Sequence, residues 1–139
     1  IGDEDLVYSL ASFVSEIGMV PVICATGGTS ENLVPLIMKL AENYGYPVPM
    51  VCLDFNYDTL THMLGEIDVD LIIGSSKAYK SSKAHGVPLL RMGFPIHDRF
   101  GAASRITTGY LGSRFLLNDI VNTFIRKKQE DNPVGYTYQ

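Results

Sequence analysis

Short apolar runs alternate with longer amphipathic stretches along most of this chain. Each run is four to six residues long and is bounded by glycine, proline or polar residues, as Val20–Ala25 is by Thr26-Gly27-Gly28. Runs that are apolar throughout are typical of parallel strands buried on both faces. The other runs that predict strands are Met50–Leu53, Leu71–Gly74 and Val87–Met92.

Apolar side chains between these runs recur at the three- and four-residue spacing of helices. Gly18 is placed to end the first helix. Asp3, Asn32 and Asp58 stand where they can cap the first three helices. Two more helices are predicted, a polar one over Lys77–His85 and a long one over Tyr110–Gln129.

Alternation of strands and helices predicts an α/β domain with right-handed crossovers. We expect a doubly wound, Rossmann-like parallel sheet of four to five strands flanked by helices. The length of 139 residues fits one domain, which we place at 1–129, with 130–139 as a C-terminal tail. Ile1-Gly2 stand where the end of a first strand belongs, so we expect this chain to be a piece of a larger protein.

Charge and cysteine content narrow the classes of function. The net charge of −4 argues against a dedicated nucleic-acid-binding protein. No apolar run reaches the length of a membrane span, and the acidic start does not resemble a signal peptide. Cys24 and Cys52 are expected to be reduced residues of a cytoplasmic protein. The three histidines are scattered, which makes a structural zinc site improbable.

Two binding functions are suggested by residues that follow predicted strands. The loop Gly27–Ser30 opens a helix and could offer backbone N–H groups to a small anionic ligand. A phospho-acceptor receiver domain carries its acids and hydroxyl at positions that correspond to Asp3, Asp5, Asp54 and Ser75. A receiver also needs a lysine after the last strand, and this chain has Gly93-Phe94-Pro95 there.

A long stretch from Gly93 to Thr108 shows neither helical nor strand periodicity. Loops of this length in compact domains are usually functional or disordered. Phe94 is apolar beyond a strand end, and Asp98-Arg99 could present a guanidinium to a partner or pair internally beneath a lid. Tyr110 follows at the start of the last helix, with the area and hydroxyl that favour interfaces.

A family resemblance rests on several motifs in order along the chain. GFPIHDR at 93–99 and GYLG at 109–112 are the specific ones. GDED at 2–5, DLIIGSS at 70–76 and IVN at 120–122 are weaker. Together they resemble the C-terminal domain of nitrogenase component 1 proteins. Within this family, the chain is most similar to the beta-type branch. That branch comprises molybdenum-iron protein beta chains and the homologous subunit of the cofactor-assembly scaffold. Glu4 departs from the family pattern, which has proline there, and so does Ser75-Ser76-Lys77.

The resemblance implies a part of an oxidoreductase subunit that acts in nitrogen fixation or in iron-molybdenum cofactor assembly. The full-length complex would include an alpha-type subunit and an iron protein as electron donor. Its iron-sulfur clusters and iron-molybdenum cofactor would be held by residues outside this chain. No catalytic, cofactor-binding or metal-binding residue is therefore assigned here, and the fragment alone is expected to be inactive. Its implied role is scaffold and subunit contact, with Phe94, His97, Asp98, Arg99 and Tyr110 as candidate contact residues.

Overall fold

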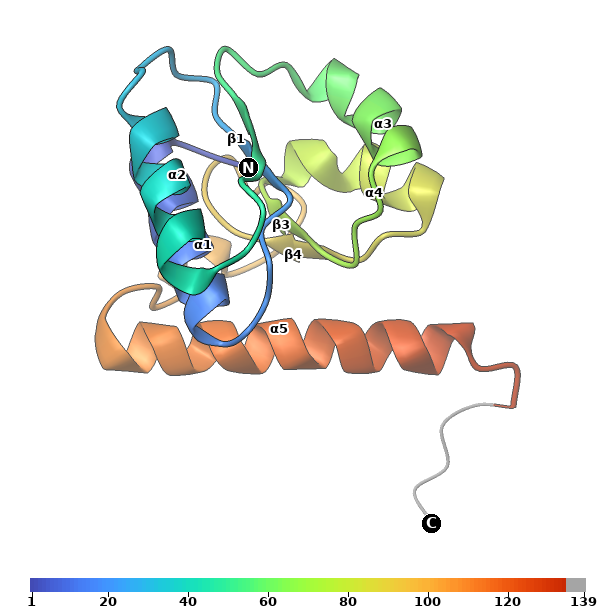
Figure 1. Ribbon diagram of the computed structural model, residues 1–139. Helices are drawn as coiled ribbons and strands as arrows, with labels where there is room; N and C mark the ends of the chain where they lie inside the picture. The colour runs from blue at the N-terminus through green and yellow to red at the C-terminus, as the bar shows by residue number, and fades with distance from the viewer. Residues whose placement is uncertain (135–139) are drawn as a thin grey trace.

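Short parallel strands lie between two layers of helices in the computed structural model, which describes residues 1–134 (Figure 1). Within these residues the α-helices are α1 (Glu4–Glu16), α2 (Leu33–Tyr44), α3 (Tyr57–Glu66), α4 (Tyr79–His85) and α5 (Gly109–Asp131). The strands are β1 (Ile23–Ala25), β2 (Met50–Cys52), β3 (Ile72–Gly74) and β4 (Leu89–Arg91). Two 3₁₀ turns are η1 (Ser76–Ala78) and η2 (Ala102–Ser104).

The strands form two parallel pairs, β1 with β2 and β3 with β4. Ile1 and Gly2 lie between the pairs: the Gly2 amide donates to the Ala25 carbonyl at 3.1 Å, and the Ile1 amine donates to the Ile73 carbonyl at 2.8 Å. The prediction of an α/β fold with parallel strands is confirmed. The expected continuous sheet is replaced by two pairs because its central strand is represented by these two residues.

Each helical layer packs on strands through an apolar cluster. α1 and α2 cover β1, and α1 and α5 cover β4. The other layer includes α3, which packs on β3 and η1. Figure 1 shows α1 and α2 on the left and α5 below the strands, with α3 and α4 at the upper right. Helices on both faces of parallel strands are the arrangement that alternating strand and helix signals predict.

Helix boundaries agree with the sequence patterns except at some ends. Gly18 follows α1 with a φ of 85°, a conformation that glycine adopts without steric cost. Asn56, and not Asp58, caps α3: its side chain accepts from the Asp58 amide at 3.1 Å. The helix begins at Tyr57, two residues earlier than a cap at Asp58 would allow, so Asp58 falls inside the helix. Asp3 and Asn32 occupy cap positions, but neither side chain makes a capping hydrogen bond.

The long last helix extends past its predicted end. α5 begins at Gly109 and ends at Asp131, so Glu130 and Asp131 of the predicted tail are helical. The last turn is polar and carries no apolar stripe. Because the predicted helix was defined by its apolar stripe, the prediction ended two residues too early. Residues 132–134 lie beyond the helix, and 135–139 of the predicted tail lie outside the described residues.

None of the helices described here combines the length and the apolar character that crossing a lipid bilayer requires.

Candidate functional site

The loop that leaves β4 turns sharply at Gly93. Gly93 has a φ of 84°, and a Cβ placed there would lie 2.7 Å from Cδ2 of Leu6 on α1. The peptide bond between Phe94 and Pro95 is cis. A side chain at position 93 would meet both backbone strain and a contact with α1, so this turn needs glycine.

An internal polar network holds the next part of the loop. The Arg91 guanidinium on β4 donates from Nε and Nη2 to the Asp98 carboxylate at 2.7–2.9 Å. The Ser76 hydroxyl also donates to Asp98, and it accepts from the His97 amide at 3.2 Å. The Arg91 guanidinium lies over the Tyr79 ring, 5.3 Å from its centroid. Two-pronged pairing of arginine with a carboxylate fixes geometry as well as charge.

Electrostatics reinforces this network. The Arg91 hydrogen bonds, followed by that of Ser76, hold the pKa of the Asp98 carboxyl well below its usual range. The Arg91 side chain is 10% exposed and that of Asp98 is 27% exposed. Asp98 therefore stays charged and turned toward β4 and η1, where it anchors the loop to the strands.

Aromatic and cationic side chains on the same loop point outward. Phe94 is 86% exposed, and His97, Arg99 and Phe100 are exposed as well. Arg99 donates to the backbone carbonyl of its neighbour Asp98 at 2.6 Å, and its side chain lies 3.6 Å from that carboxylate. The loop thus combines an anchored base with an apolar and positively charged outer surface.

The start of α5 adds to this surface. Tyr110 is 98% exposed. Gly109 has a φ of 67°, and a Cβ on Gly112 would lie 2.5 Å from the Thr107 carbonyl carbon, so the loop crosses close to the first helical turn. Arg105 pairs with Asp119 and ties the end of the loop to the helix. Farther along α5, Leu117, Val121 and Ile125 are exposed at four-residue spacing and so share one helix face.

The structure sorts the five predicted contact residues into different positions. His97 and Asp98 meet at Ser76, whereas Phe94 and Arg99 face outward from the same loop. Tyr110 stands on α5 and not on the loop. Whether these residues contact a partner stays a prediction.

Three residues of this region were missed by sequence reasoning: Ser76, Arg91 and Phe100. Arg91 carried a usable signal, because a charged residue inside an apolar strand run needs a partner when it is buried. Sequence spacing did not mark Ser76 as the hydroxyl that joins His97 to Asp98. Ser76 lies more than twenty positions before both residues in the chain.

The loop between β1 and α2 holds one of the chain's own carboxylates. Glu4 accepts from the Ser30 amide at 3.0 Å, and a Cβ on Gly28 would lie 2.2 Å from Oε1 of Glu4. Thr26 accepts the Gly28 amide at 3.1 Å. Glu4, which departs from the family pattern, thus fills the position at which the sequence suggests an external anion.

The described residues do not fit a metal cluster. Within 1–134, no group of three or more histidine, cysteine or acidic side chains is placed to hold a metal ion. Cys24 on β1 is buried, and burial raises the pKa of its thiol to about 11. Burial also raises the pKa of the Cys52 thiol on β2. Iron-sulfur clusters are held by cysteine thiolates, and these two thiols favour the protonated form.

Comparison with known proteins gives consistent relatives. The chain is 36% identical over 131 residues to the nitrogenase molybdenum-iron protein beta chain of Methanococcus maripaludis. The aligned region covers 93% of this chain and 28% of the relative. It is 31% identical over 123 residues to the nitrogenase iron-iron protein beta chain of Rhodobacter capsulatus. That alignment covers 87% of this chain and 26% of the relative. The chain therefore spans little more than a quarter of the length of these relatives.

A solved structure has the same fold. The structure titled "Nitrogenase Cp1 at pH 6.5" superposes with a TM-score of 0.92 at 23% identity, over 99% of this chain and 30% of that one. The sequence model of the family described as nitrogenase component 1 type oxidoreductase matches residues 1–125. With nearly the whole chain matched, this protein belongs to the nitrogenase component 1 type oxidoreductase family.

Proposed function

We propose that this chain is the part of a beta-type nitrogenase-like subunit that supplies scaffold and subunit contacts. The observation that carries the proposal is the loop 93–108, whose base is fixed by Arg91 and Asp98 while Phe94, Arg99 and Phe100 stay exposed. Rigid aromatic and arginine side chains are enriched among residues that dominate the binding energy of interfaces.

The whole protein would act as one subunit of an oxidoreductase complex in nitrogen fixation. Relatives named as molybdenum-iron and iron-iron beta chains support this role over cofactor assembly. Its partners would be an alpha-type subunit and an iron protein that donates electrons, in the cytoplasm. The iron-sulfur clusters and iron-molybdenum cofactor of that complex would be bound by residues beyond this chain, because the described residues offer no fitting donor set.

Arg99 provides the sharpest test of the contact surface. Its guanidinium donates to a backbone carbonyl, whereas Arg91 and Ser76 hold the Asp98 carboxylate. Removal of Arg99 should therefore leave the loop anchored. We expect Arg99→Ala in the full-length subunit to weaken co-purification with the alpha-type subunit, by about 2 kcal/mol, or roughly thirtyfold in affinity, if this arginine is a central contact.

The same substitution in the 139-residue chain should change the free energy of unfolding by less than about 0.5 kcal/mol. Arg126→Ala, which removes an exposed arginine farther along α5, is the matched control and should leave assembly intact. If Arg99→Ala destabilises the short chain by more than about 2 kcal/mol while assembly is unchanged, the loop serves as a lid on its own domain.

A further inference from the structure

Positive charge is concentrated in one segment of the chain. Residues 71–108 hold six lysines and arginines and one acid, a net charge of +5, whereas residues 1–70 hold eleven acids and one lysine. The one acid of the basic segment is Asp98, whose charge Arg91 neutralises. The other cations of the segment include three lysines at three-residue spacing, Lys77, Lys80 and Lys83.

The fold turns these three lysines outward. Ser81 and Ser82 form the buried face of α4. The Ser81 hydroxyl shares a hydrogen bond of 2.7 Å with the Thr61 hydroxyl of α3. The Ser82 hydroxyl donates to the Val87 carbonyl at 2.7 Å. Because the serines fix the inner face of α4, its lysines are presented to the surface, and all three lysines of the segment are exposed.

The lysines and the loop after β4 belong to one surface. The Ser76 amide donates to the Pro95 carbonyl at 3.1 Å, which brings Lys77, the next residue, beside the loop. Tyr79 at the start of α4 is half-exposed, and the Arg91 guanidinium lies over its ring. We define the basic surface as the exposed cations around this junction, Lys77, Lys80, Lys83 and Arg99.

The lysines of the basic surface have no acidic neighbour along α4. In the part of the chain that the structure describes, none of the ion pairs includes these lysines. By contrast, Lys127 on α5 pairs with Asp131 one helical turn away. Like charges three or four residues apart on a helix, such as Lys80 and Lys83, repel each other. Carboxylates supplied by another molecule would remove this repulsion.

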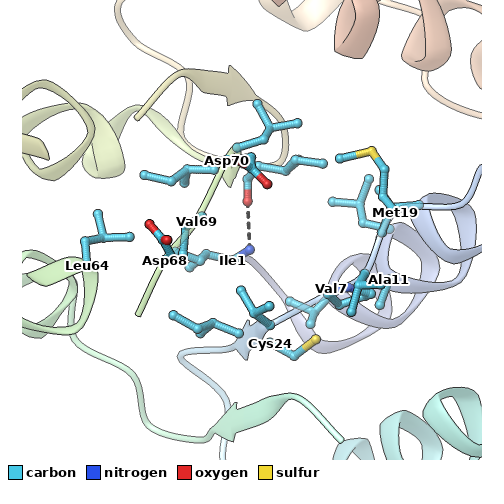
Figure 2. A pocket seen from close by; sticks show the side chains of 18 of the residues that line it. Ile1, Val7, Ala11, Met19, Cys24, Leu64, Asp68, Val69 and Asp70 are labelled. Atoms are coloured by element: carbon cyan, nitrogen blue, oxygen red, sulfur yellow. Dashed lines mark hydrogen bonds between the residues drawn. The ribbon is translucent and has the colours of Figure 1, made fainter. Parts of the chain in front are cut away.

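Acidic side chains lie on other parts of the molecule. Glu31 and Asp54 are exposed in the segments that follow β1 and β2, whereas the basic surface follows β3 and β4. Asp68 and Asp70 precede β3 and so lie at its opposite end. Figure 2 shows both beside the apolar groove that lies between the two strand pairs and contains Ile1. The basic surface is therefore separated from the chain's own acids.

We propose that the basic surface binds an acidic patch on a partner subunit, whose carboxylates pair with the lysines and with Arg99. This inference rests on the contact role proposed above and adds the chemistry of the partner. Phe94 and Phe100 are exposed beside Arg99 and would cover apolar groups between those carboxylates. Opposite potentials on two surfaces speed their association and select the correct partner.

Charge favours a protein partner over a nucleic acid. Domains that bind nucleic acids are typically basic overall, whereas this chain has a net charge of −4. A long polyanion would also reach from the basic surface to the acidic segments after β1 and β2. A second copy of the chain is disfavoured because contact between its basic and acidic sides is head to tail, and such contacts grow into open filaments unless the rotation closes.

The affinity of the full-length subunit for its alpha-type partner tests the proposal at two salt concentrations. At about 50 mM NaCl, we expect Lys80→Glu to raise the Kd at least about fivefold and Lys80→Gln to raise it less. At about 500 mM NaCl, the effect of Lys80→Glu should fall below about twofold, because salt screens exposed charges. Lys39→Glu makes the same charge change on an exposed position of α2 and is the control, with a Kd within about twofold of the natural value.

Both Lys80 variants are expected to fold. Lys80 is exposed and makes no ion pair in the described part of the chain, so the Tm should stay within about 2 °C of the natural subunit. If Lys80→Glu does not fold, Lys80→Gln combined with Lys83→Gln carries the test, with the same salt-sensitive loss of affinity expected.

Several results would overturn the proposal. One is an equal change in Kd for Lys80→Glu and Lys39→Glu, and another is a loss that persists at high salt. If Arg99→Ala weakens assembly and Lys80→Glu does not, the contact role stands and the acidic partner is wrong. If neither weakens assembly, both proposals are wrong. Binding of a labelled RNA of about 20 nucleotides, or association of the subunit with itself, that Lys80→Glu abolishes would assign the basic surface to a nucleic acid or to a second copy.

Discussion

A charged pair between two parts of the chain, Arg91 and Asp98, decides how the loop after β4 is held. Arg99 is next to Asp98 in the sequence, yet it is Arg91 that donates hydrogen bonds from Nε and Nη2 to the Asp98 carboxylate. The β4 strand places Arg91 under the returning loop, where the Tyr79 ring covers its guanidinium. At this scale the loop is anchored by geometry that depends on where a strand ends.

Acid should weaken this anchor in a defined pH range. The folded state keeps Asp98 charged, since Arg91 and Ser76 lower the pKa of its carboxyl, whereas an unfolded Asp has a pKa of about 3.9. The pair therefore stabilises the fold above that pH, and its contribution is lost as the pH falls below about 4 toward the lower folded value. We expect Asp98→Asn to lower the free energy of unfolding at pH 7, and the difference from the natural chain to shrink below about pH 4.

Chemical denaturation between pH 7 and pH 3 measures both quantities. Asp131→Asn is the control, because that carboxylate accepts from Lys127 at the exposed end of α5 and should contribute less than about 0.5 kcal/mol. A difference between Asp98→Asn and the natural chain that stays constant down to pH 3 would show that the Asp98 charge does not stabilise the fold.

At the scale of single elements, α5 depends on how closely its first turn meets the preceding loop. Two glycines in helices illustrate opposite constraints. A Cβ on Gly112 of α5 would lie 2.5 Å from the Thr107 backbone, whereas a Cβ on Gly65 of α3 would lie 3.7 Å from the His85 side chain at its nearest contact. The first glycine is needed for a close approach, and the second costs α3 backbone entropy without making one.

Alanine at these two positions should therefore act in opposite directions. Gly65→Ala is expected to raise the free energy of unfolding by up to about 1 kcal/mol, the usual advantage of alanine over glycine in a helix. Gly112→Ala should lower it by about 1–3 kcal/mol, because the Thr107 backbone must shift. Thermal or urea denaturation of the two variants measures both changes in the free energy of unfolding. Stabilisation by Gly112→Ala would contradict the close approach of the Thr107 backbone.

The whole molecule is an α/β domain, with helices on both faces of its strands, that exposes apolar side chains outside its core. Exposed aromatic side chains lie on the loop after β4 and at the start of α5, and an apolar groove separates the strand pairs. Surfaces of this kind mark contacts with other protein. The chain spans 28% of one relative's length, and the exposed aromatic side chains are consistent with the contact role proposed above.

Purification without oxygen should yield this chain with no stoichiometric iron. Within residues 1–134, no three donor side chains gather at one point, and the raised pKa of the Cys24 thiol disfavours a thiolate ligand. Elemental analysis together with the visible absorption spectrum measures this. Stoichiometric iron that is lost in Cys24→Ser or Cys52→Ser would assign a cluster to this chain and contradict the expectation.

Local patterns along the chain were enough to predict most elements of the fold. The run Val20–Ala25 contains β1, and Gly18 ends the helical segment before it, because burial of apolar side chains and the conformational freedom of glycine act over a few residues. The motifs GFPIHDR and GYLG likewise indicated the family that the comparison established. The cap of α3 is Asn56 and not Asp58, because both residue types can accept a first-turn amide and the helix begins at Tyr57.

The sequence by itself therefore determined the order of strands and helices, the parallel α/β class and the family. Only the tertiary structure decided that Asp98 pairs with Arg91 and not chiefly with Arg99, that Ser76 joins them, and that Glu4 fills the loop before α2. It also decided that Ile1 and Gly2 lie between two separate strand pairs. Hydrogen bonds and charge pairs act over about 3 Å in space, and the chain positions that come within that distance depend on how the strands are placed.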